Sequence, residues 1–163
     1  LVGSEPVTLE ISDQKMGVKT GKMEYDLRLI DPSAVKRPPR IPELSFAACV
    51  DIPAKELSEA LKGAMRMAGK KDDIVVIQDD EKFSLLCKTP GAGFRAIWPL
   101  SEVRVRDGES RSVMAMDYMS DIAAALAGTV TIESGIDSPL VLSAKNGEIA
   151  TVFMLAPRLE QDE

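Results

Sequence analysis

Apolar and polar residues alternate loosely from residue 44 to residue 52 (LSFAACVDI), and the period then lengthens. From Ala54 to Gly69, apolar residues recur every three or four positions, with Pro53 before the stretch and Gly69 as a C-cap. This pattern predicts a strand followed by an amphipathic helix. The apolar side of the helix is formed by Leu57, Ala60, Leu61, Ala64 and Ala68.

Short strand-like stretches fill the chain from residue 73 to residue 116, separated by turn signals at Asp79-Asp80-Glu81, Pro90-Gly91 and Asp107-Gly108. Asp117 is suited to N-cap a second helix, which Gly128 ends. Three closing strands follow, at 129–134, 139–145 and 149–156. This order of elements predicts an α+β fold with antiparallel sheets and two helices.

The closing strands repeat a pattern from the start of the chain. Residues 7–32 and 130–157 both begin Val-Thr-aliphatic-Glu, cross a glycine-bearing turn and end in a long strand that stops at a proline. The repeat predicts a duplicated domain. Four prolines lie between the two copies in IDPSAVKRPPRIPEL, which favours an extended connector. We expect closing strands of a first domain at 1–30, a connector at 31–43, a complete second domain at 44–157 and an acidic tail at 158–163.

Composition excludes several kinds of chemistry. The chain of 163 residues has no histidine, which removes Ser-His-Asp and Cys-His catalysis and the usual zinc ligand. Cys49 and Cys87 lie in strand-like runs without metal-ligand spacing, so we expect buried free thiols. We expect no catalytic residue, no metal site and no cofactor.

The net charge of −6 argues against a protein that binds nucleic acid through its bulk charge. Contact with DNA therefore requires basic residues gathered on one face. Lys55, Lys62 and Arg66 lie within about 40° of one another on the side of the first helix opposite its apolar residues. The alternative is an ordinary solvated helix face.

Four segments occur in a characteristic order: DPSAVKRPPRIPELSF, MAMDYMSDI, TVTIESGIDSPLVL and FMLAPRLE. Together they resemble the archaeal proliferating cell nuclear antigen (PCNA) family of DNA sliding clamps over nearly the whole chain. The resemblance implies two similar domains per subunit and a homotrimeric ring around duplex DNA, with helices lining the hole. It implies a processivity factor rather than an enzyme, soluble in the archaeal cytoplasm and associated with the nucleoid. The implied partners are duplex DNA, bound without sequence specificity, and DNA polymerase, ligase, flap endonuclease and the clamp loader.

The same resemblance places Lys55, Lys62 and Arg66, which we call the basic stripe, on a helix that faces DNA. Ser120 stands where relatives often carry a lysine, and the second helix has no basic residue, which puts DNA contact from that helix in doubt. A partner peptide is expected beneath the connector, in a pocket formed by Val35, Ile41, Pro139, Met154, Leu155, Ala156 and Pro157. The alternative is that these residues only finish a core strand.

Subunits of the family join through edge strands of the two domains, and exposed strand edges pair readily with another chain. The matching stretches are residues 23–30 and 93–100. The interface candidates are Tyr25, Leu27, Leu29, Phe94, Ile97 and Trp98. A core position is the alternative for Trp98.

Relative to the family pattern, about half a domain is expected before residue 1. Two explanations stay open: a truncated clamp and a naturally short relative. The interrupted repeat and the absent methionine favour the truncated clamp. Two functions also stay open: a ring-forming clamp subunit, and a clamp-like interaction protein that caps or decoys a full clamp without encircling DNA. A stable trimer supports the first, and a monomer that binds a full clamp supports the second.

Overall fold

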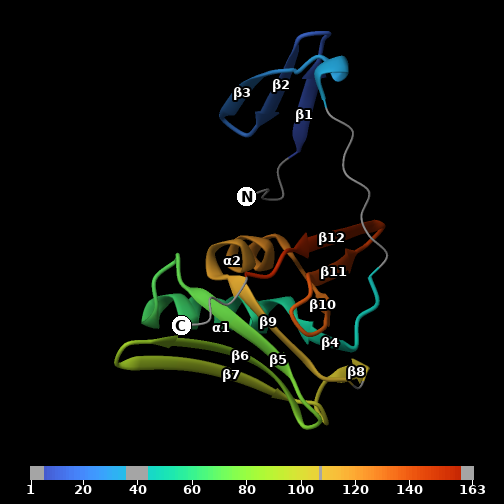
Figure 1. The fold of residues 1–163 in the computed structure, drawn as a ribbon. Helices are drawn as coiled ribbons and strands as arrows, with labels where there is room; N and C mark the ends of the chain where they lie inside the picture. Colours follow the sequence, from blue (N-terminus) through green and yellow to red (C-terminus); the bar gives the residue numbers. More distant parts are fainter. Residues whose placement is uncertain (1–5, 36–43, 107, 159–163) are drawn as a thin grey trace. The chain divides into compact units, whose positions relative to one another are not determined.

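The computed structural model describes residues 6–35, 44–106 and 108–158 (Figure 1). The chain divides into two compact units, residues 1–43 and 44–163. The division falls where the predicted connector ends. The assignment of the units to an incomplete and a complete clamp domain stays a prediction.

The first unit is an antiparallel meander of three strands in the order β1-β2-β3, namely Val7–Ile11 (β1), Lys15–Thr20 (β2) and Met23–Arg28 (β3). A 3₁₀ turn at Pro32–Ala34 (η1) follows. The register sets Leu9 opposite Val18 and Val18 opposite Tyr25. Because side chains alternate along a strand, one face of this sheet is apolar. It carries Val7, Leu9, Ile11, Met16, Val18, Met23, Tyr25 and Leu27.

This apolar face is largely uncovered within the first unit: Leu9 is 55% exposed and Ile11 is 70% exposed. The opposite face is charged, with Lys19 Nζ 3.3 Å from Glu10 Oε1 and 3.8 Å from Glu24 Oε1. Packing this apolar face against another surface would remove it from water and add to the stability of the sheet.

The second unit contains two antiparallel sheets. The larger has the order β12-β11-β10-β4-β8, with strands Ala48–Pro53 (β4), Arg104–Arg106 (β8), Thr129–Ser134 (β10), Leu140–Asn146 (β11) and Ile149–Leu155 (β12). The smaller has the order β7-β6-β5-β9, with strands Asp73–Gln78 (β5), Lys82–Thr89 (β6), Ala92–Pro99 (β7) and Ser110–Ala115 (β9). Strands β10 to β12 form a meander like β1 to β3, in agreement with the sequence repeat.

Two helices, Ala54–Met67 (α1) and Met116–Ala125 (α2), pack together and against the sheets (Figure 1). Leu57, Leu61 and Ala64 of α1 are fully buried, as the apolar spacing predicts. The core they join is aliphatic and rich in methionine, and it includes Val50, Ile52, Leu85, Met114, Met119, Ile132 and Leu142. None of the helices in the described residues has the length and apolarity that a membrane span requires.

The predicted helix ends and thiol burial need correction. Helix α1 ends at Met67 with Ala68 as its C-cap, so Gly69 is not the cap. Helix α2 already begins at Met116, and Asp117 lies in its first turn, where its Oδ1 accepts the N–H of Tyr118. It ends at Ala125, and Gly128 lies beyond the C-cap with a φ of 73°. Both cysteines are free, but Cys49 is only half-buried.

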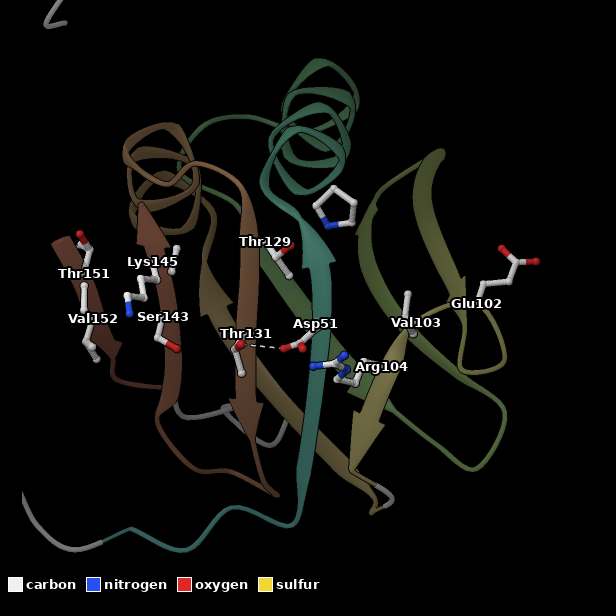
Figure 2. A pocket seen from close by; sticks show the side chains of 13 residues that line it. Asp51, Glu102, Val103, Arg104, Thr129, Thr131, Ser143, Lys145, Thr151 and Val152 are labelled. Atoms are coloured by element: carbon white, nitrogen blue, oxygen red, sulfur yellow. Dashed lines mark hydrogen bonds between the residues drawn. The ribbon is translucent and has the colours of Figure 1, made fainter. Parts of the chain in front are cut away.

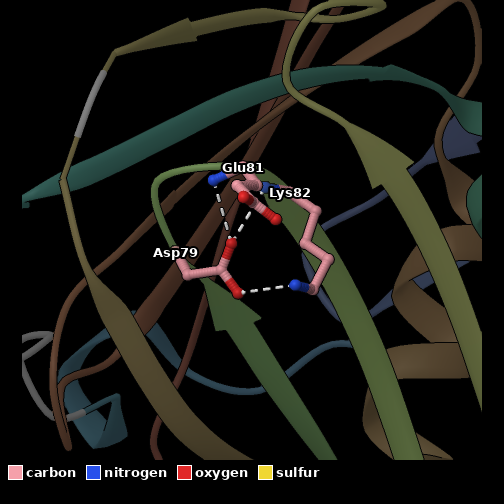
Figure 3. Close-up of polar contacts among 3 residues, drawn as sticks. All are labelled: Asp79, Glu81 and Lys82. Carbon is pink, nitrogen blue, oxygen red and sulfur yellow. Dashed lines mark hydrogen bonds and ion pairs between the residues drawn. The ribbon is translucent and has the colours of Figure 1, made fainter.

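The acidic cluster after β5 is a tight turn (Figure 3). Asp79 Oδ1 accepts the backbone N–H groups of Glu81 and Lys82, both at 3.0 Å, and Asp79 Oδ2 lies 3.1 Å from Lys82 Nζ. The hydrogen bond from Glu81 is the main cause of a pKa below the ordinary value for Asp79. No group of three potential metal ligands occurs among the described residues. Asp79 therefore stabilises the β5–β6 turn.

We predict that Asp79→Ala lowers the free energy of unfolding by about 0.5–1 kcal/mol, because the turn loses hydrogen bonds to a partly exposed carboxylate. A lowered folded pKa means that the contribution of Asp79 is present above its unfolded pKa and is lost as the pH falls through the folded pKa. Urea denaturation of Asp79→Ala and wild type should therefore differ at neutral pH and converge as the pH falls below the lowered folded pKa of Asp79. Asp80→Ala is the matched control, and an equal loss in that variant would contradict the role of Asp79.

Candidate functional site

The basic stripe on α1 is exposed to solvent. Lys55, Lys62 and Arg66 all lie outside the core, and Lys55 is paired with Glu59 at 3.9 Å. Lys62 and Arg66 form no ion pair with any other described residue. Lys55 and Lys62 line a shallow groove of about 680 Å³ between α1 and the end of α2, together with Ser58, Ala124 and Ala127. The stripe therefore presents two positive charges that are unpaired among the described residues, and one of them, on Lys62, lies at the groove.

Helix α2 forms the other side of this groove, and it carries no basic residue, as expected. Tyr118 on α2 is 61% exposed. Lys70 follows α1, and its Nζ lies 3.5 Å from Asp121 Oδ1 of α2. This ion pair brings a positive charge to α2. The sequence pattern did not reveal this pair, because it depends on how the two helices pack.

The end of β12 and the residues after it form an apolar surface, which we call the apolar end and define as Met154, Leu155, Ala156 and Pro157. Met154 is 41% exposed and Ala156 is exposed, whereas Leu155 packs partly against the core. Leu155 pairs with Leu140, the residue after half-buried Pro139. The structure thus brings Pro139 and the apolar end together. Within the apolar end, Leu155 packs against the core, whereas Met154 and Ala156 are exposed.

The other two predicted pocket residues belong to the first unit. Val35 caps η1 and is 59% exposed. Ile41 lies outside the described residues. Their part in a peptide pocket stays a prediction.

Both predicted interface strands are sheet edges. Strand β3 is the last strand of the first-unit sheet, and Tyr25 and Leu27 on it are nearly half exposed. Leu29 follows β3, is half-buried, and donates its N–H to Gln14 O. Strand β7 is an edge of the four-stranded sheet, and Ile97 on it is 48% exposed.

Trp98 and Phe94 on β7 point to the core side. Trp98 is 9% exposed, and its indole N–H donates to Glu56 Oε2 of α1 at 2.8 Å. The ring of Phe94 lies so close to α1 that a Cβ at Gly63 would be 2.8 Å from it. Trp98 therefore takes the core alternative in this chain, and Phe94 is shared between the core and the strand edge.

A second groove, of about 720 Å³, lies on the open face of the five-stranded sheet (Figure 2). Directly paired residues Arg104, Asp51, Thr131, Ser143 and Val152 cross five strands there. Asp51 Oδ1 accepts the hydroxyl of Thr131 at 2.6 Å. The sequence pattern did not reveal this row, because which polar strand positions lie side by side depends on how the strands pair.

We predict that Trp98→Ala lowers the free energy of unfolding of the second unit by about 3–5 kcal/mol, because a large core side chain is removed. Ile97→Ala, on the exposed side of the same strand, should change it by less than about 0.5 kcal/mol. Urea denaturation followed by far-ultraviolet circular dichroism measures both. A Trp98→Ala protein with wild-type stability would assign Trp98 to an interface instead of the core.

No family model matches the chain. A curated relative, the DNA polymerase sliding clamp of Methanothrix thermoacetophila, is 35% identical over 97% of this chain and 66% of its own length. The DNA polymerase sliding clamp of Archaeoglobus fulgidus is 31% identical over 96% of this chain and 65% of its own length. The chain thus spans about two thirds of the length of these curated relatives.

Solved structures agree. A structure of the C-terminal region of FEN-1 bound to A. fulgidus PCNA has a TM-score of 0.80 and 29% identity, over 97% of this chain and 66% of that chain. PCNA from Thermococcus kodakaraensis, at 23% identity and a TM-score of 0.73, supports the fold alone. The predicted α+β clamp fold is confirmed, and the chain belongs to the archaeal PCNA family of DNA sliding clamps.

Proposed function

We propose that the chain acts as a subunit of a DNA sliding clamp, which encircles duplex DNA as a homotrimer and holds replication and repair proteins on it. The observation that carries the proposal is its 35% identity to a DNA polymerase sliding clamp across 97% of this chain. The proposed role is binding and not catalysis. DNA polymerase, ligase, flap endonuclease and the clamp loader are the proposed partners.

Contact with DNA is assigned to α1. Lys62 and Arg66 are exposed and unpaired among the described residues, whereas Lys55 shares its charge with Glu59. Long basic side chains on one helix face suit phosphate contacts, which carry no sequence information and weaken with salt. Such contacts are compatible with a protein that moves along DNA.

Recruitment of partners is assigned to the apolar end of β12 with Pro139. Exposed apolar side chains at the end of an edge strand suit an extended peptide with an apolar or aromatic anchor. The solved complex of the FEN-1 C-terminal region with A. fulgidus PCNA supports a peptide ligand for this fold. Val35 and Ile41 are the proposed contribution of the connector.

Ring closure is assigned to β3 of one copy and β7 of the next. When β3 of one copy pairs with β7 of the next, the two sheets join. Their apolar sides then form one continuous face only if Tyr25 and Leu27 point to the same side as Phe94. A shift by one residue reverses every side chain, so this requirement limits the register. It places the acidic residues Glu24 and Asp26 of β3 on the same side as exposed Arg95 of β7.

Arg95 and Asp26 each form no ion pair with another described residue, whereas Glu24 already lies near Lys19. Registers that set Arg28 opposite Arg95 are disfavoured because like charges repel directly across a strand pair. We infer that Arg95 faces a carboxylate of β3, with Asp26 the favoured one.

Encirclement can be tested by topology. Linear duplex is incubated with the protein, its two ends are then blocked by bulky groups, and retained protein is measured after a high-salt wash. A ring should stay on this duplex but not on duplex whose ends were blocked before mixing. Equal retention on both would overturn the proposed ring.

Binding of the protein to the same duplex, measured over a series of salt concentrations, tests α1. Lys62→Ala combined with Arg66→Ala should lower the salt dependence of initial binding to duplex by about one to two phosphate contacts. Lys145→Ala, on the open face of the five-stranded sheet, is the control and should leave that slope unchanged.

We predict that Arg95→Glu weakens self-association at least about tenfold, because it places like charges together at a strand pair. Asp26→Arg should weaken it similarly, and the double variant should recover most of the loss. Light scattering over a concentration series measures the association, with Arg104→Glu on β8 as the matched control. Wild-type association of the Arg95→Glu protein would reject the proposed register.

A further inference from the structure

The residues that follow β12 cross from one sheet of the second unit to the other. Strand β12 is an edge of the five-stranded sheet, and β9 is an edge of the four-stranded sheet. The backbone N–H of Arg158 donates to Val113 O on β9 at 2.8 Å. The apolar end is therefore held on both sides. Its first two residues, Met154 and Leu155, pair with β11, and Arg158, which follows its last residue, bonds to β9.

The loop between β10 and β11 occupies the neighbouring part of the same β9 edge. Arg111 N–H donates to Gly135 O at 3.2 Å, and Asp137 N–H donates to Arg111 O at 2.9 Å. The hydroxyl of buried Ser112 lies 3.0 Å from Gly135 O and accepts the N–H of Ser138 at 3.2 Å. These contacts fix the start of the segment that leads into Pro139.

One side-chain contact holds the residues that cross from β12 to β9. Arg158 Nε lies 3.0 Å from Asp73 Oδ1, at the first residue of β5. This oxygen is buried and has no aligned hydrogen-bond donor among the described residues. The guanidinium of Arg158 therefore supplies the compensating charge for a covered carboxylate oxygen. Pro157, directly before it, restricts the backbone further because its φ is fixed.

We propose that the Arg158–Asp73 pair is a clip that positions the apolar end for an extended partner peptide. The proposal rests on the peptide-docking role given above and adds two positioning residues that need not touch the ligand. A surface already held in its binding shape loses less conformational freedom when a peptide docks. Breaking the clip releases residues 156–158 from β9 in the free protein, and the peptide must then order them.

Both partners are nearly half exposed, at 47% for Arg158 and 43% for Asp73. An ion pair with this exposure contributes little to the stability of the whole unit. The clip should therefore affect peptide affinity more than unfolding. This difference separates a positioning role from a purely structural one.

The test uses the full chain and a fluorescein-labelled peptide of the FEN-1 C-terminal region as the probe. Arg158→Ala and Asp73→Asn should each raise the dissociation constant about three- to tenfold, as expected for one ordered segment. The charge swap, Asp73→Arg with Arg158→Asp, should recover at least half of the loss. Arg104→Ala is the matched control, and Met154→Ala should weaken binding without affecting the clip.

Amide hydrogen exchange of the peptide-free protein gives a second readout. The amide of residue 158 should exchange faster in Arg158→Ala and Asp73→Asn than in wild type, while the amides of β5 and β6 remain protected. Recovery of slow exchange in the charge swap would support the clip.

The outcomes are distinct. If wild type binds the peptide and Arg158→Ala binds it equally well, the clip is overturned while the docking role stands. If exchange at residue 158 is unchanged in both single variants, the clip is also overturned. If wild type does not bind the peptide, the docking role is overturned, and the clip loses its proposed purpose with it.

Discussion

The second unit depends on the burial of Leu57 and Leu61 of α1 against the core sides of both sheets. Each side chain is fully buried within a cluster that draws on β4, β6, β10 and α2. Full burial of one leucine contributes about 1.5–3 kcal/mol. Because the helix can bury only one side, Lys62 and Arg66 must face solvent. The core packing thus decides where the basic stripe is displayed.

The same constraint leaves particular strand edges and faces open. In the second unit, β12 and β8 end one sheet, and β7 ends the other. The edge of β9 is different, because the β10–β11 loop bonds to Arg111 and the backbone of Arg158 bonds to Val113 there. Covered and open edges therefore have separate uses in the proposed function. The open edge of β7 can join another copy, and the covered edge of β9 anchors the surface where a peptide is proposed to dock.

The first unit shows the cost of an uncovered face. Its three strands place their apolar residues on one side, and no element within residues 6–35 covers that side fully, with Ile11 70% exposed. Only β2 is paired on both sides, and the apolar face stays largely open in the described residues of the unit. Packing against a surface outside the unit would therefore add to the stability of the sheet. The proposed pairing of β3 with β7 would extend its apolar side into an existing core.

The sequence by itself determined the elements whose pattern is local: the amphipathic period of α1, the alternation in the strands and the Lys55, Lys62 and Arg66 stripe. The repeated strand pattern likewise predicted two similar meanders. Tertiary structure alone decided the rest. Trp98 has the alternation of an edge strand, yet it is buried because Glu56 and Phe83 lie next to it in space. Asp73 and Arg158 are 85 positions apart, and only the crossing from β12 to β9 brings them within 3.0 Å. Contacts of this range depend on sheet packing, which no local period encodes.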